Sequence, residues 1–124
     1  MTITEKVRDH VKEQCQKDTN IFSMDAFDSH FVTVVKYAKE LANKRNGDLE
    51  ITELSAWLHD IGSIMGDPEN HHITGANYAE KLLKSFDYPQ DKIEKIKHCI
   101  ISHRGSQNIK RESIEAECLA DADS

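Results

Sequence analysis

The feature that most constrains the fold of this chain is a helical hydrophobic periodicity, which runs through almost all of its 124 residues. Apolar residues recur at spacings of three and four, and no alternating run of β-branched residues is long enough to require a sheet. Only two prolines and five glycines interrupt the pattern. We therefore predict an all-α fold, a single compact domain over residues 1–124 built as a bundle of about six helices.

Cap and stop residues in the sequence delimit the predicted helices. The helices are expected over approximately Thr4–Lys17, Ala26–Arg45, Thr52–Asp60, His72–Phe86, Pro89–His103 and from Ser113 onward. Asn46-Gly47 is a helix stop signal, because both residues tolerate the left-handed conformation. Thr52 and Ser113 have side chains that cap helix N-termini, and Pro89 suits a first turn.

Composition and charge exclude several classes of protein. The net charge of −6 argues against a nucleic-acid binder, which usually carries a basic face, although a solvated acidic surface explains the charge equally well. No apolar stretch approaches the roughly 20 residues of a membrane span. Three cysteines without a Cys-x-x-Cys pair favour reduced thiols, as small buried side chains in a cytoplasmic protein. The oligomeric state is left open.

Histidine is unusually frequent, with seven in the chain, and one of them, His59, stands beside Asp60 where a predicted helix ends. Five of the predicted helices each offer a metal-ligand type at an end or on an apolar face. These residues are His30, His59, Asp60, His72, His103 and Asp121. A buried histidine or ionised aspartate is costly without a partner, and one shared metal centre would satisfy all of them. Imidazole and carboxylate together suit a divalent cation such as Zn, Mn or Fe.

Each candidate also has an ordinary structural explanation. A single histidine on an apolar face, such as His30, is more often a core residue than a ligand. Asp121 and Asp123 alone would be a solvated acidic tail. The three other histidines are expected at the surface. His71 is alternatively a helix cap, and His98 alternatively lies beside the site, whereas His10 is expected only at the surface.

Five motifs, in this order, resemble the HD domain superfamily of metal-dependent phosphohydrolases. They are Ser29-His30-Phe31, Leu58-His59-Asp60-Ile61-Gly62, His72-Ile73-Thr74-Gly75-Ala76, Ile100-Ile101-Ser102-His103 and Leu119-Ala120-Asp121-Ala122-Asp123. The resemblance extends over nearly the whole chain from about Asp25 onward. It implies an all-helical fold in which metal is held between helices.

The resemblance also implies a ligand set and an activity. One metal ion (Fe, Mn, Zn, Co or Mg) would be bound by four residues: His30, His59, Asp60 and Asp121. His72 and His103 match histidines of members that hold a second ion, and Asp60 would then bridge the two. Metal-activated water would hydrolyse a small phosphate ester or a nucleotide. Arg104 would hold the substrate phosphate, or would only place a favourable charge at a helix C-terminus.

Some positions depart from well-known branches of this superfamily. An acid commonly stands three residues beyond the signature Asp in the nucleotidases and the guanosine tetraphosphate hydrolases, but here that residue is Ser63. The Gly-Tyr-Pro motif of the cyclic-di-GMP phosphodiesterases is absent. The chain stops at Ser124, just past the last candidate ligand, so we expect a short member or a truncated chain. The alternatives to an enzyme are a non-catalytic HD-type module for ligand sensing or protein contact, and an unrelated helical interaction domain.

Overall fold

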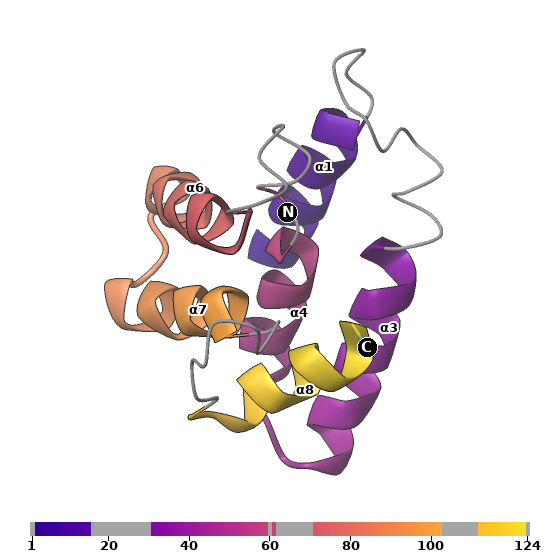
Figure 1. The fold of residues 1–124 in the computed structure, drawn as a ribbon. Coiled ribbons are helices and arrows are strands. Elements are labelled where there is room, and N and C mark those ends of the chain that lie inside the picture. The colour runs from indigo at the N-terminus through magenta and orange to yellow at the C-terminus, as the bar shows by residue number, and fades with distance from the viewer. Residues whose placement is uncertain (1, 16–30, 60, 62–70, 103–111, 124) are drawn as a thin grey trace.

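The computed structural model describes residues 2–15, 31–59, 61, 71–102 and 112–123, and this part of the chain contains six helices and no strand. The helices are α1 (Ile3–Cys15), α3 (Val32–Lys44), α4 (Leu49–Leu58), α6 (His71–Ser85), α7 (Gln90–Ser102) and α8 (Ile114–Asp123), arranged as in Figure 1. The all-α prediction is confirmed. The predicted helical ends at residues 16–17 and 26–30 lie outside the described residues. None of the described helices is long and apolar enough to cross a membrane.

Helix α4 lies at the centre of the molecule and contacts α1, α3, α6, α7 and α8 (Figure 1). Two helix pairs, α3 with α8 and α6 with α7, flank it. A helix in this position must be apolar on nearly every side, and α4 buries Ile51, Leu54 and Leu58 almost completely. The core therefore forms around the helix that leads into His59-Asp60.

The predicted core faces of the outer helices point inward. Val7 and Val11 on α1 are fully buried, as the spacing of four predicts. Ala116 and Leu119 on α8, three positions apart, are also fully buried. Helix α8 begins as expected, because the Ser113 hydroxyl accepts a hydrogen bond from the Ala116 backbone N–H at 3.1 Å.

The stop signal Asn46-Gly47 ends α3 as predicted. Asn46 takes a positive φ of 59°, and the Gly47 N–H bonds back to the Ala42 carbonyl at 2.8 Å. The left-handed residue is therefore the asparagine. A side chain at Gly47 would be tightly packed, since a Cβ there would lie 3.1 Å from a carboxylate oxygen of Glu115 and 3.2 Å from a methyl of Ile114.

The prediction that Thr52 caps the next helix was wrong, because α4 starts one turn earlier. Asp48 is the N-cap, and its carboxylate accepts a hydrogen bond from the Ile51 N–H at 3.0 Å. Thr52 is buried inside the helix, and its hydroxyl donates to the Asp48 carbonyl at 2.7 Å. A threonine can bond back to its own helix in this way, so its presence does not by itself mark a helix start.

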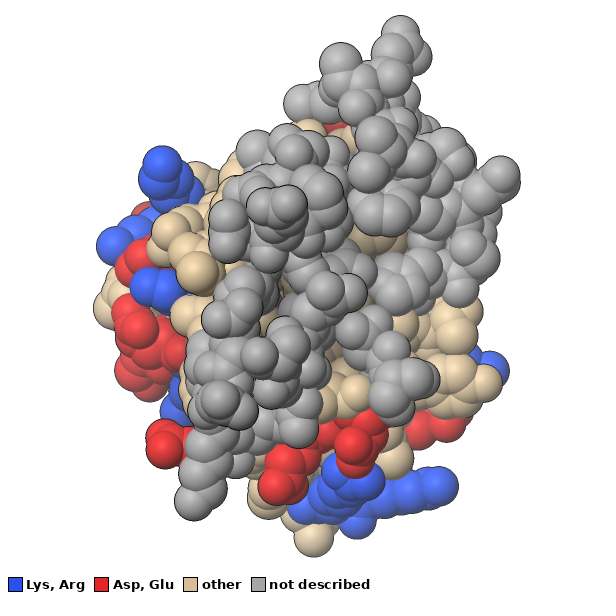
Figure 2. All heavy atoms as spheres, viewed as in Figure 1, with Lys and Arg blue, Asp and Glu red and all other residues tan. Residues whose placement is uncertain are grey.

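Charged side chains of both signs lie next to each other around the described rim of the face shown in Figure 2. One such group joins α6 to α7: Glu80 accepts from Lys97 at 3.0 Å and from the side-chain amide of Gln90 at 3.1 Å. Lys84 contacts the same carboxylate at 3.3 Å. These donors lower the pKa of Glu80 from 4.5 to about 2, Lys97 contributing most.

Candidate metal centre

His59 follows the last residue of α4 and is completely buried. Its ring nitrogen Nδ1 lies 2.6 Å from the Ala56 carbonyl oxygen. A carbonyl only accepts hydrogen bonds, so Nδ1 carries a proton. In the neutral ring the lone pair then belongs to Nε2, which is the form in which a histidine binds a metal. The backbone bond therefore fixes both the tautomer and the orientation of the ring.

An aromatic ring at the start of α3 packs against His59. Phe31, the residue directly before α3, is 1% exposed, and its ring centroid lies 5.8 Å from that of His59 at an interplanar angle of 58°. The residue next to His30 in the chain is thereby packed against His59. Two motifs that are almost thirty positions apart in sequence therefore meet where α3 begins and α4 ends.

Asp121 lies in a different setting. Its side chain is 56% exposed, and one carboxylate oxygen is 2.9 Å from the guanidinium of Arg45. The carboxylate raises the pKa of Arg45. Arg45 follows the C-terminal end of α3, about 20 Å of helix rise from Phe31. Asp121 also lines an open pocket of about 380 Å³ with Tyr37 and Lys44. The ion pair with Arg45 uses one oxygen of this carboxylate, Oδ2.

The other candidate positions lie outside what the structure describes. His30, Asp60, His103 and Arg104 are in undescribed segments, and His72 is the second residue of α6 with its side chain undescribed. Among the described residues no three His, Cys, Asp or Glu side chains are close enough to hold a metal ion. The ligand set His30, His59, Asp60, His72, His103 and Asp121 therefore stays a prediction, as does the role of Arg104.

Two histidines expected at the surface have structural partners instead. His10 on α1 is half-buried, and its Nε2 is 2.5 Å from the Tyr78 hydroxyl of α6. His98 on α7 is also half-buried, and its Nε2 accepts a hydrogen bond from the Glu112 backbone N–H at 3.0 Å. Neither contact has a local sequence signal, because each joins residues that are far apart in the chain.

The described cysteines are structural. Cys99 and Cys118 are buried and unbridged, as predicted. Burial raises the pKa of the Cys99 thiol to about 11, so it stays protonated at neutral pH and is a poor nucleophile or metal ligand. The side chain of Cys15 is not described.

Comparison with known proteins matches this chain to a family and to a solved structure. The family model for the HD domain matches residues 27–124. A crystal structure described as a predicted HD superfamily hydrolase, from an uncultured Thermotogales bacterium, is 26% identical and superposes with a TM-score of 0.77. That match covers 99% of this chain and 72% of the other. No curated protein matches.

The family match contains the sequence motifs around His30, His59 and Asp121. It begins near the start of the second predicted helix and runs to the end of the chain. The structural match adds the same helical architecture over nearly all of the molecule, including α1. The resemblance inferred from the five motifs is therefore correct, and this chain belongs to the HD domain family.

Proposed function

We propose that this protein is a metal-dependent phosphohydrolase that cleaves a small phosphate ester or a nucleotide. Family membership supports the proposal, because HD domains are generally metal-dependent. The structural relative, described as a predicted hydrolase, supports the reaction class. The observation that carries the proposal is His59, a fully buried histidine whose Nδ1–H is held by the Ala56 carbonyl.

The residues of the chain have separate tasks under this proposal. His59 and Asp60 anchor the ion, the histidine through Nε2 and the aspartate through its carboxylate. The Phe31 ring packs against the His59 ring, with 5.8 Å between their centroids. Arg104 binds the substrate phosphate with paired N–H groups. A divalent metal held there would lower the pKa of a bound water and would stabilise negative charge on the phosphoryl oxygens.

The test measures phosphate release and metal binding on the same protein. Purified chain is loaded with Mn, Fe, Co, Zn or Mg in turn and assayed against phosphomonoesters, phosphodiesters and nucleotides. Asp60→Asn preserves shape but weakens the anchor, so we expect activity to fall by roughly 100-fold or more. The control is Asp91→Asn, an exposed acid in the first turn of α7, which should keep full activity.

Metal binding is followed independently by thermal unfolding. A metal at 100 times its Kd should stabilise the native chain by about 2.7 kcal/mol, and Asp60→Asn should lose most of that gain. A chain that gains no stability from any of the five metals, and releases no phosphate with any of them, would contradict the proposal.

The alternative is a non-catalytic HD module, and one observation favours it. The Asp121 carboxylate is already ion-paired with Arg45. A module of this kind would bind metal weakly or structurally and would release no phosphate. Stabilisation of the chain by metal, with no hydrolysis of any substrate in the panel, would support the non-catalytic module over the phosphohydrolase.

A further inference from the structure

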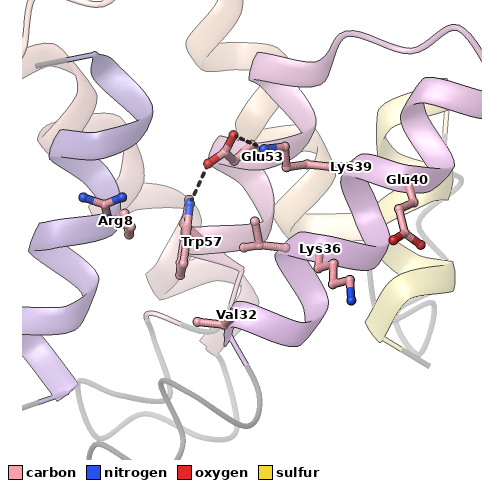
Figure 3. Close-up of a pocket in the computed structure, with 8 residues that line it drawn as sticks. Arg8, Val32, Lys36, Lys39, Glu40, Glu53 and Trp57 are labelled. Carbon is pink, nitrogen blue, oxygen red and sulfur yellow. Dashed lines mark hydrogen bonds and ion pairs between the residues drawn. The ribbon is translucent and has the colours of Figure 1, made fainter.

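Two described histidines form hydrogen bonds between segments that are distant in the chain, His10 on α1 and His98 on α7. The ion pair that joins α3 to α4 in Figure 3 is of another kind, with 3.3 Å between the Lys39 ammonium and a carboxylate oxygen of Glu53. Histidine is the side chain whose charge ordinarily changes between pH 5 and 8. A moderate change of pH therefore acts on the two histidine contacts.

These two hydrogen bonds differ in how they respond to a proton. The partner of His10 is the Tyr78 hydroxyl, which both donates and accepts, so this contact can persist when the ring is protonated. The partner of His98 is the Glu112 backbone N–H, which only donates. Nε2 of His98 must therefore present its lone pair, and the neutral ring carries its proton on Nδ1. A protonated ring has N–H groups at both positions, and two donors cannot bond to each other.

The His98 contact joins α7 to the start of α8. Glu112 stands directly before Ser113, the N-cap residue whose hydroxyl accepts from the Ala116 N–H. On the other side of the contact, α7 is held in the core next to His98 by Cys99, which is fully buried. Loss of the contact would therefore move residue 112 and not α7. The cap is a separate hydrogen bond, so α8 itself would remain helical.

Helices α4, α6 and α8 pack against α7, so their charges bear on a proton at His98. Helices α4 and α8 contain no lysine or arginine. The charged side chains of this region are mainly acidic: Glu80 of α6, Glu94, Lys95 and Lys97 of α7 itself, and Glu112 and Glu115 at the start of α8. Of the two lysines, Lys97 is bonded to Glu80. A positive ring is therefore not repelled by α4 or α8, and the lost hydrogen bond decides the response.

We infer that His98 is a pH-sensitive switch between α7 and the start of α8. With a neutral ring, Nε2 binds the Glu112 N–H and holds residue 112 against α7. As the pH falls from 8 toward 5, the ring takes up a proton and the contact opens. The contribution of the contact to stability is thus complete at the upper end of this range and is lost on acidification. The switch does not depend on the proposed phosphohydrolase activity.

The test follows the His98 ring and the Glu112 amide by NMR in the ¹⁵N-labelled full chain, between pH 8 and 5. At the upper pH the ring should carry its proton on Nδ1 and none on Nε2. The Glu112 amide peak should shift as the pH falls, with the same midpoint as the ring. Fluorescence of Trp57, the single tryptophan, reports whether the packing of α1, α3 and α4 around it stays intact (Figure 3).

Variants at His98 separate the acceptor from the titrating ring. His98→Gln keeps an acceptor oxygen but has no group that titrates, so the Glu112 amide should lose the shift with the ring's midpoint. His98→Leu removes the acceptor, and hydrogen exchange of this amide at neutral pH should become about 2- to 10-fold faster than in His98→Gln. His10→Gln changes the other histidine contact, and as the matched control it should leave the titration of Glu112 unchanged.

The carboxylate of Glu112 requires its own variant, because its titration also shifts the amide of the same residue. Glu112→Gln keeps the backbone N–H, so the shift that follows His98 should persist. A neutral ring protonated on Nε2 would overturn the proposal. So would a titration that survives in His98→Gln, one that disappears in Glu112→Gln, or unchanged amide exchange in His98→Leu.

Discussion

His59 is the candidate metal ligand whose surroundings the structure describes most fully. Its position before Asp60 was enough to mark it as a candidate, and its burial follows from the apolar residues that precede it on α4. Its protonation state does not follow from the sequence. That state depends on the turn of backbone that brings the Ala56 carbonyl within 2.6 Å of Nδ1. The three-dimensional structure thus adds the tautomer of His59, which the motif does not give.

Asp121 allows a sharp test at a single residue. If it is a metal ligand, Arg45 competes for its carboxylate, so Arg45→Gln should tighten metal binding and Asp121→Asn should weaken it about tenfold or more. Lys44→Gln is the matched control, because it removes a nearby charge from the same pocket and leaves the ion pair intact. Metal affinity is measured by competition with a coloured chelator.

Asp123, two residues after Asp121, provides the result that would contradict this assignment. Asp123 follows Leu119 and Ala120, which are both buried, at spacings of four and three, the spacing of one side of a helix. Strong loss of metal binding in Asp123→Asn, with normal binding in Asp121→Asn, would show that the assignment of Asp121 is wrong.

At the scale of elements, the sequence predicts a helix end well when a capping residue within one turn determines it. The prediction is poorer when burial of side chains in the core determines where the helix begins. Ser113 caps α8 as predicted, since the bond to Ala116 lies within one turn. Thr52 has an equally suitable side chain, but Asp48 begins α4 and the core covers the threonine. The two possible capping residues, Asp48 and Thr52, are four positions apart. Burial of Ile51 and Leu54 in the core favours the longer helix, which begins after Asp48.

The turn between α3 and α4 should be sensitive to one methyl group. Gly47→Ala would push against Glu115, whose carboxylate accepts the Asp48 N–H at 2.9 Å and ties α8 to this turn. We expect a loss of about 1 kcal/mol in the free energy of unfolding, measured in urea. Repeating the change in a Glu115→Ala background should reduce the loss, and an undiminished loss there would place the strain elsewhere.

The contact between α6 and α7 should give the molecule part of its acid sensitivity. The pKa of Glu80 is lowered from 4.5 to about 2, so its contribution to stability is complete above about pH 4.5 and is lost as the pH falls toward 2. The difference in unfolding free energy between the parent and Glu80→Gln should therefore shrink over that interval. It is followed by urea unfolding at several pH values.

An exposed acid elsewhere serves as the control for this effect. Glu117→Gln on α8 removes a carboxylate that makes no ion pair among the described residues. Its effect on stability should show no comparable change between pH 4.5 and 2. Parallel behaviour of the two variants would mean that general surface charge, and not the bonds from Lys97 and Gln90, accounts for the acid sensitivity.

For the whole molecule, the sequence alone determined the helical class, most of the helix boundaries and the family. Those properties rest on periodicity, caps and motif order, which are interactions or patterns within a few residues of each other. Only the tertiary structure decided that α4 is the central helix, that Phe31 covers His59, and that Asp121 pairs with Arg45. Each of these joins segments that are distant in the chain, and packing of the complete core selects among many such pairings that local patterns leave open.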